Sequence, residues 1–150
     1  KLFSLKKINS LQYLITKLNI LTYVFIILFS CSLILFGDLI MTIFRIDNND
    51  FLLLLYLFIL SELISNSSYS GGSVLLMTGQ IRYLLLTKII CFSTFLISLL
   101  STYNYGLIGA GLSFVLVSTV QTILVTFYCY RQTKLKLNLI QNYKYVLKKK

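Results

Sequence analysis

Long stretches without charged residues run through this sequence, and they decide what it can fold into. Residues 19–37 and 107–130 contain no Asp, Glu, Lys or Arg. As α-helix, the first stretch extends about 28 Å, which matches the hydrocarbon core of a bilayer. Charged residues make up only 12% of the chain, about half the share in a soluble domain. The predicted fold class is therefore an all-α integral membrane protein.

The distribution of apolar residues predicts four transmembrane helices. Their ranges are 19–37, 51–78, 83–101 and 107–130. The polar loop expected at 38–50 contains the apolar stretch 39–44, which either extends the first span or lies at the membrane interface. The second range is longer than a straight span requires and has a polar, small-residue middle. It predicts one helix with a bent or unwound centre, which needs protein or a wet cavity to satisfy its backbone.

The segments outside the spans are basic. Residues 1–18 combine lysines with apolar residues at three- and four-residue steps, which predicts a cytoplasmic amphipathic helix or a connector between spans. With the N-terminus inside, segments 1–18, 79–88 and 131–150 are cytoplasmic and hold 13 of the 14 Lys and Arg residues. The positive-inside rule then predicts both termini in the cytoplasm. It also accounts for the net charge of +10, so no nucleic-acid partner is expected.

Glu62 is the one acidic residue inside an apolar segment. A charge at membrane depth costs at least about 2.5 kcal/mol, so we expect this side chain to face the bundle interior, either protonated or paired. It either binds a proton, a cation or a polar substrate, or fixes helix packing by a hydrogen bond.

The polar tract from Ser65 to Ser73 follows Glu62. As a cavity lining it would bind sugars or phosphate through Asn66, Ser67, Ser68 and Ser70; the alternative is an extramembrane loop, which would put residues 79–88 outside.

Small residues open the fourth predicted span. They are Gly106, Gly109, Ala110, Gly111 and Ser113. The pairs Gly106/Ala110 and Gly109/Ser113 are spaced four residues apart, which lets helices approach closely in lipid, so their expected role is packing. The sequence contains no histidine, and its three cysteines are far apart, so no metal site is expected. Without a Ser-His-Asp set or a carboxylate pair within one span, the chain is not expected to be an enzyme.

Two stretches carry a family resemblance. Residues 66–82 read NSSYSGGSVLLMTGQIR, and residues 105–111 read YGLIGAG. The first resembles a small-polar helix that ends in a Leu-Met-Thr-Gly turn and a basic residue. The second is similar to a Tyr-Gly-x-x-Gly-Ala start of the last span in a six-helix lobe. Both features are those of polysaccharide flippases, closest to the O-antigen (Wzx-type) flippase, in the MATE-like multidrug/oligosaccharidyl-lipid/polysaccharide superfamily; the likeness covers roughly residues 19–135.

The resemblance implies a function and a set of partners. It implies that the chain is the C-terminal portion of a two-lobe transporter, with the N-terminal part of the same transporter as partner, which agrees with a start at Lys1. The transporter would move undecaprenyl-diphosphate-linked oligosaccharide, an O-antigen or capsule unit, across the bacterial inner membrane. It would use no cofactor other than an H⁺ or Na⁺ gradient, with Glu62 as the only acid placed for coupling.

The basic residues near the third span admit two roles. Arg82 and Lys88 are the candidate diphosphate contacts, or else they anchor the topology at the cytoplasmic face. Two other functions fit the same composition. One is a small helical membrane scaffold or accessory subunit, and the other is a drug exporter of the same superfamily.

Overall fold

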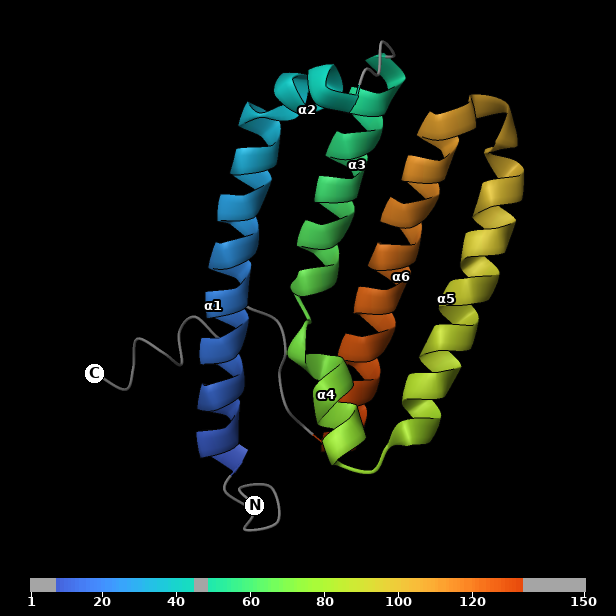
Figure 1. The fold of residues 1–150 in the computed structure, drawn as a ribbon. Helices are drawn as coiled ribbons and strands as arrows, with labels where there is room; N and C mark the ends of the chain where they lie inside the picture. Colours follow the sequence, from blue (N-terminus) through green and yellow to red (C-terminus); the bar gives the residue numbers. More distant parts are fainter. Residues whose placement is uncertain (1–7, 45–48, 134–150) are drawn as a thin grey trace.

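The computed structural model describes residues 8–44 and 49–133, and over these ranges it consists of helices joined by short turns, with no strand (Figure 1). The helices are α1 (Ile8–Leu35), α2 (Gly37–Phe44), α3 (Asn49–Asn66), α4 (Ser70–Met77), α5 (Ile81–Ser101), the 3₁₀ turn η1 (Tyr103–Tyr105) and α6 (Gly106–Thr133). The predicted all-α class is confirmed. The start of the 1–18 segment, residues 45–48 of the predicted loop and most of the 131–150 tail lie outside the described residues.

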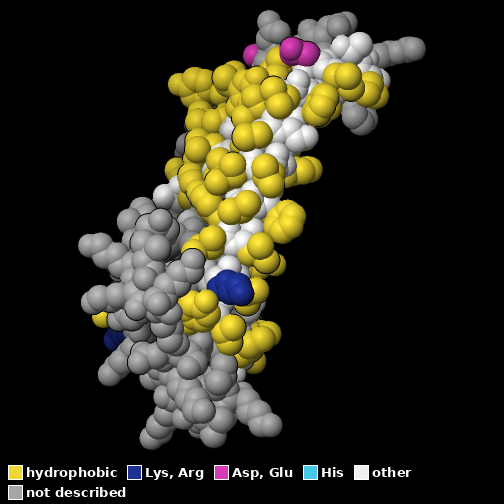
Figure 2. Space-filling view, turned by 90° about the vertical axis from the view of Figure 1, so that its left-hand side faces the viewer, with side chains coloured by type: hydrophobic (Ala, Val, Ile, Leu, Met, Phe, Trp, Pro, Cys, Tyr) yellow, Lys and Arg dark blue, Asp and Glu magenta, His cyan; other side chains and the backbone are white. Residues whose placement is uncertain are grey.

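Four helical stretches are long and apolar enough to cross a membrane. They are Tyr13–Leu35, Asp50–Met77, Ile81–Ser101 and Tyr103–Thr133, with mean hydropathies between 1.6 and 2.3. Few of their residues are buried, and large side chains such as Phe25 and Phe92 stay about two-thirds exposed. Apolar side chains accordingly cover most of the described surface in Figure 2. Such a surface is stable in hydrocarbon and not in water, and the chain is a multi-pass membrane protein.

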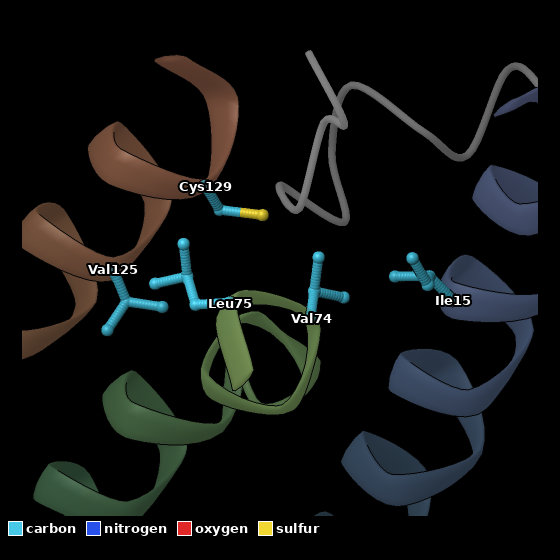
Figure 3. Packing of buried hydrophobic residues seen from close by; sticks show 5 residues of the cluster. All are labelled: Ile15, Val74, Leu75, Val125 and Cys129. Carbon is cyan, nitrogen blue, oxygen red and sulfur yellow. The ribbon is translucent and has the colours of Figure 1, made fainter. Parts of the chain in front are cut away.

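The long helices form a single layer in the spatial order α1, α3, α6, α5 (Figure 1). Helices α3 and α6 pack together at the centre, α1 flanks α3, and α5 flanks α6. The short helix α2 links α1 to α3, and η1 makes the tight turn between α5 and α6. Helix α4 continues beyond the end of α3 and lies between α1 and α6 (Figure 3).

The buried residues of this layer are unusual for a soluble protein. Among the described residues, eleven buried positions are polar and seven are hydrophobic. Hydroxyl groups join the central helices: the Ser61 and Ser118 Oγ atoms lie 2.7 Å apart, and Thr122 Oγ1 donates to the Ile64 carbonyl at 3.0 Å. Because lipid is as apolar as any side chain, helices in a membrane associate through close packing and hydrogen bonds such as these.

Close packing depends on two of the predicted small residues. A Cβ atom on Gly109 would collide with the Thr102 carbonyl, and one on Gly111 would lie 2.7 Å from Leu57 Cδ1. Ser113 is fully buried and lies 3.2 Å from the Thr102 hydroxyl. Gly106 differs from the prediction. Its φ of 54° forms the turn into α6, and a Cβ there would have no neighbour within 4 Å, so Gly106/Ala110 is not a packing pair.

The helix boundaries at the N-terminal side differ from those predicted. Helix α1 runs unbroken from Ile8 to Leu35, so residue 18 is not a helix boundary. No proline or glycine interrupts this range, and Ile15 and Asn19 are buried rather than facing a membrane surface. The expected loop at 38–50 begins as helix α2, which continues from α1 after a turn at Phe36. Its apolar residues make a short helix more favourable than an exposed loop.

The second span is broken where its polar tract predicts. Helix α3 ends at Asn66 and α4 begins at Ser70, with short-range bonds such as Ser67 N–H to the Ile64 carbonyl between them. Side chains compete for the same carbonyls: Asn66 Nδ2 donates to the Glu62 carbonyl at 2.9 Å, and Ser67 Oγ to the Ile64 carbonyl at 2.8 Å. Such local bonds offer the backbone an alternative to the helix, so the break needs no proline.

Candidate functional site

A polar cavity opens beside the break between α3 and α4. It has a volume of about 360 Å³ and is lined by residues of α3, α4, α5, α6 and the break. We call it the polar cavity, and its lining residues are Glu62, Ser65, Asn66, Ser68, Tyr69, Gly72, Ser73, Leu84, Lys88, Gln121 and Val125. The break supplies this lining because a continuous helix would turn only every third or fourth residue toward the same side.

One carboxylate and one ammonium face this cavity. Glu62 Oε2 accepts a hydrogen bond from Asn66 Nδ2 at 3.0 Å. Lys88 Nζ donates to Gln121 Oε1 at 3.3 Å. Each of these two groups is therefore held by an amide side chain, and the cavity offers one carboxyl group and one amino group to whatever enters it.

The sequence predicts that Glu62 faces the interior of the helix bundle. In the structure its side chain is exposed instead. The reason is the helical repeat. Ser61 occupies the position that faces α6, where it meets Ser118, and the next residue along a helix points about 100° away. Twelve residues separate Glu62 from Asp50 at the start of the span, which is about 18 Å of helix. Glu62 thus lies near the middle of the span, where a charge requires a wet or covered surface.

A second, apolar cavity lies between α1 and α3. Its volume is about 250 Å³, and its lining is almost entirely hydrocarbon. We call it the apolar groove, lined by Ile26, Phe29, Ser30, Leu33, Leu55, Phe58, Ile59 and Glu62. Glu62 belongs to both linings, so the apolar groove and the polar cavity meet at this side chain.

The structure brings together four of the seven polar residues that were predicted from the sequence as site residues. Glu62, Asn66, Ser68 and Lys88 all line the polar cavity. The other three point elsewhere. Ser67 Oγ bonds the Ile64 carbonyl, Ser70 is buried toward α1, and Arg82 lines a separate cavity of about 450 Å³ at the turn between α4 and α5.

Gln121 is a polar residue of the cavity lining that was not predicted from the sequence. It lies in α6, a span without any charged residue before Arg131. A signal was present, because Ser118, Gln121 and Thr122 recur at steps of three and four and form a polar stripe on an apolar helix. Ser118 and Thr122 bond α3, whereas Gln121 reaches α5 through Lys88.

The charged residues at the helix ends are separated by sign along the helices. Figure 2 shows acidic side chains near one end and basic side chains toward the other. Asp38 and Asp50 lie at the starts of α2 and α3, while Arg82 begins α5 and Arg131 ends α6. Figure 1 places these two sets of helix ends at opposite ends of the layer along the helix axes. The separation is the pattern on which the positive-inside rule operates.

The polar cavity can hold a molecule rich in hydroxyl groups. Ser, Asn and Gln side chains donate and accept hydrogen bonds, and the ammonium of Lys88 adds a partner for an anionic group. The cysteines do not contribute: Cys91 and Cys129 are buried, Cys31 is on the exposed surface of α1, and all three are free thiols. Over the part of the chain that the structure describes, no three His, Cys, Asp or Glu residues are close enough to hold a metal ion.

Compared with known proteins, this chain matches no family model, no curated protein and no solved structure.

Proposed function

We propose that this chain is part of a flippase that moves a lipid-linked oligosaccharide across a membrane. The observation that carries the proposal is the junction of the polar cavity and the apolar groove at Glu62. A ligand with a polyhydroxyl head and a long hydrocarbon tail needs both environments side by side. In the middle of a span the head also needs hydrogen-bonding groups that lipid does not offer.

The ligand proposed is an undecaprenyl-diphosphate-linked O-antigen or capsule unit. Its sugars would bond the amides and hydroxyls of Asn66, Ser68 and Gln121, and its diphosphate would pair with Lys88. Its isoprenoid tail would follow the apolar groove between α1 and α3. Arg82 lies in a different cavity, which favours its alternative role as an anchor of the topology.

The proposal includes an orientation and an energy source. The basic helix ends would be cytoplasmic and the acidic ends outside, in the inner membrane of a bacterium, and both termini would be cytoplasmic. Glu62 would take up H⁺ or Na⁺ from the outside and release it inside. The remaining part of the transporter would cover the exposed face on which Glu62 lies, because a charge at this depth is unfavourable against lipid.

The test is transport by the full-length protein in proteoliposomes that contain a polyprenyl-diphosphate-linked oligosaccharide in both leaflets. A lectin added outside measures how fast inner-leaflet sugar becomes accessible. Lys88→Gln should slow this movement about tenfold or more, because a hydrogen bond to a charged group contributes roughly 1.5–3 kcal/mol and 1.4 kcal/mol corresponds to tenfold. With an H⁺ or Na⁺ gradient imposed, Glu62→Gln should also slow it, because an uncharged amide cannot take up H⁺ or pair with Na⁺. Asp50→Asn is the matched control, since Asp50 is an acid of the same helix that lines neither cavity.

Three results would contradict the proposal, and they separate its alternatives. Wild-type protein that moves the lipid no faster than empty liposomes would remove the flippase function and favour a scaffold. Export of an apolar cation in place of the glycolipid would indicate a drug exporter. Equal movement of the polyprenyl diphosphate with and without sugar would remove the role of the polar cavity.

A further inference from the structure

Helix α4 receives its N-terminal cap from a different helix. The first N–H groups of any helix have no partner within that helix, and Tyr69, at the cap position of α4, makes no side-chain bond to it. Instead, the Ser70 N–H donates to Oδ1 of Asn19 on α1 at 3.3 Å. The cap therefore depends on how closely α1 approaches α4.

This contact leaves polar groups without partners. Asn19 is only 1% exposed, yet its Nδ2 has no hydrogen-bond partner, and neither has the Ser70 Oγ, although Ser70 is only 9% exposed. Among the described side chains, three buried polar atoms lack a partner, and two of them belong to this contact. Rotating the amide of Asn19 would not help, because its oxygen is the acceptor for the Ser70 N–H.

Helix α4 is a separate segment, bounded by a break on one side and a turn on the other. The 67–69 break precedes it, and it is followed by a turn in which Gly79 has a φ of 75°. Its two sides carry different neighbours (Figure 3): Leu75 points toward Val125 and Cys129 of α6, and Val74 points toward Ile15 of α1. The α6 side is the more completely buried, since Leu75 is fully inaccessible.

One side of the polar cavity belongs to the same segment. Tyr69, Gly72 and Ser73 line the cavity from the start of α4 and the residue before it. Any rotation of α4 away from α1 therefore moves these residues relative to Lys88 and Gln121 on the opposite helices. The position of the cavity wall and the integrity of the Asn19–Ser70 contact are mechanically linked.

We propose that Asn19 is a positioning residue that holds α4 through a releasable latch. With the latch closed, as in this structure, one long hydrogen bond caps α4 while Asn19 Nδ2 and Ser70 Oγ are buried and unpaired. With the latch open, α4 leaves α1, both groups become hydrated, and the polar cavity changes width. The unpaired groups make closure only weakly favourable, so both states are populated. This inference holds for any ligand of the cavity and does not depend on the proposed function.

The experiment measures the distance between α1 and α4 in the full chain embedded in liposomes. Spin labels attached to a non-natural amino acid at positions 14 and 77, both exposed in the structure, leave the native cysteines unchanged. Double electron–electron resonance should give two distance populations. Ser70→Ala removes an unpaired hydroxyl and keeps the N–H bond, so the shorter distance should gain about tenfold. Asn19→Ala removes the cap and should shift the ratio by a similar factor toward the longer distance.

The opposite directions of these shifts distinguish a latch from ordinary packing. If the contact were a purely structural hydrogen bond, Ser70→Ala, which keeps the backbone N–H donor, would leave the ratio unchanged, and only Asn19→Ala would shift it. Ser30→Ala, a buried serine of α1 that lies in the apolar groove, is the control and should leave the ratio unchanged. A single distance that none of the variants alters, or a shift of Ser70→Ala toward the longer distance, would overturn the proposal.

Discussion

Gly109 permits a close approach of α6 to Thr102 at the end of α5, and its replacement by alanine gives a sharp prediction. A Cβ atom at this position would collide with the carbonyl oxygen of Thr102 and would lie 3.0 Å from the Thr102 carbonyl carbon and from its Cβ. The obstructing atoms are backbone, and Thr102 is fixed there because its hydroxyl donates to the Gly109 carbonyl at 3.0 Å. The turn between α5 and α6 therefore has to open before a methyl group fits.

The expected change in the free energy of unfolding combines two opposing contributions. Overpacking costs roughly 1–3 kcal/mol and occasionally more, with the upper end expected when backbone must move. Alanine recovers about 0.5–1 kcal/mol in a helix interior relative to glycine. We expect Gly109→Ala to lower the free energy of unfolding by about 2 kcal/mol. Gly111→Ala should cost less, because the nearest atom, 2.7 Å away, is a terminal methyl of Leu57, which can rotate.

The assay is denaturant titration in detergent micelles, with helix content followed by circular dichroism. Gly72→Ala is the matched control, because the nearest atom to its Cβ, on Leu84, would lie 3.7 Å away, an ordinary contact distance. This variant should be about 0.5–1 kcal/mol more stable than the wild type. If Gly109→Ala and Gly72→Ala unfolded at the same denaturant concentration, the close approach of α6 to Thr102 would be refuted.

Two further variants test other parts of the same structure. Gly79→Ala should lower the free energy of unfolding by about 1–2 kcal/mol, because its φ of 75° strains any residue with a Cβ although the space around it is open; denaturant titration measures this, and an unchanged midpoint would contradict the turn geometry. A double-mutant cycle of Ser61→Ala and Ser118→Ala should give a coupling of about 0.6 kcal/mol in the free energy of unfolding, typical of a hydrogen bond between membrane helices. A coupling of zero would contradict the contact between α3 and α6 at these residues.

The spans could be predicted from the sequence because the signal is local. Each uncharged apolar stretch specifies a helix by its length and composition, and the polar tract specifies its own break through side chains that bond nearby carbonyls. The start of α1 was missed because lysines at helical spacing are equally compatible with a surface helix and with the first turns of a span. Only the packing of Ile15 and Asn19 against α4 decides between them.

The candidate site could be predicted only in part. Glu62 and Asn66 are four residues apart, so their proximity is implied by a helix. Lys88 and Gln121 are 33 residues apart, and nothing local relates them until the α5–α6 turn is known. The orientation of Glu62 was wrong because the prediction assumed a compact bundle with an interior. A single layer of helices has two open faces, and Ser61 takes the position toward α6.

The neighbour order α1, α3, α6, α5 places a demand on biosynthesis. The central partner of α3 is not in the next span, which is α5, but in the one after it, α6, and Ser118 follows Ser61 by 57 positions. At 5–20 residues per second, α3 spends roughly 3–11 s in the membrane before α6 is made. During this interval the Ser61 hydroxyl and the Ile64 carbonyl lack the bonds to Ser118 and Thr122 that later join α3 to α6.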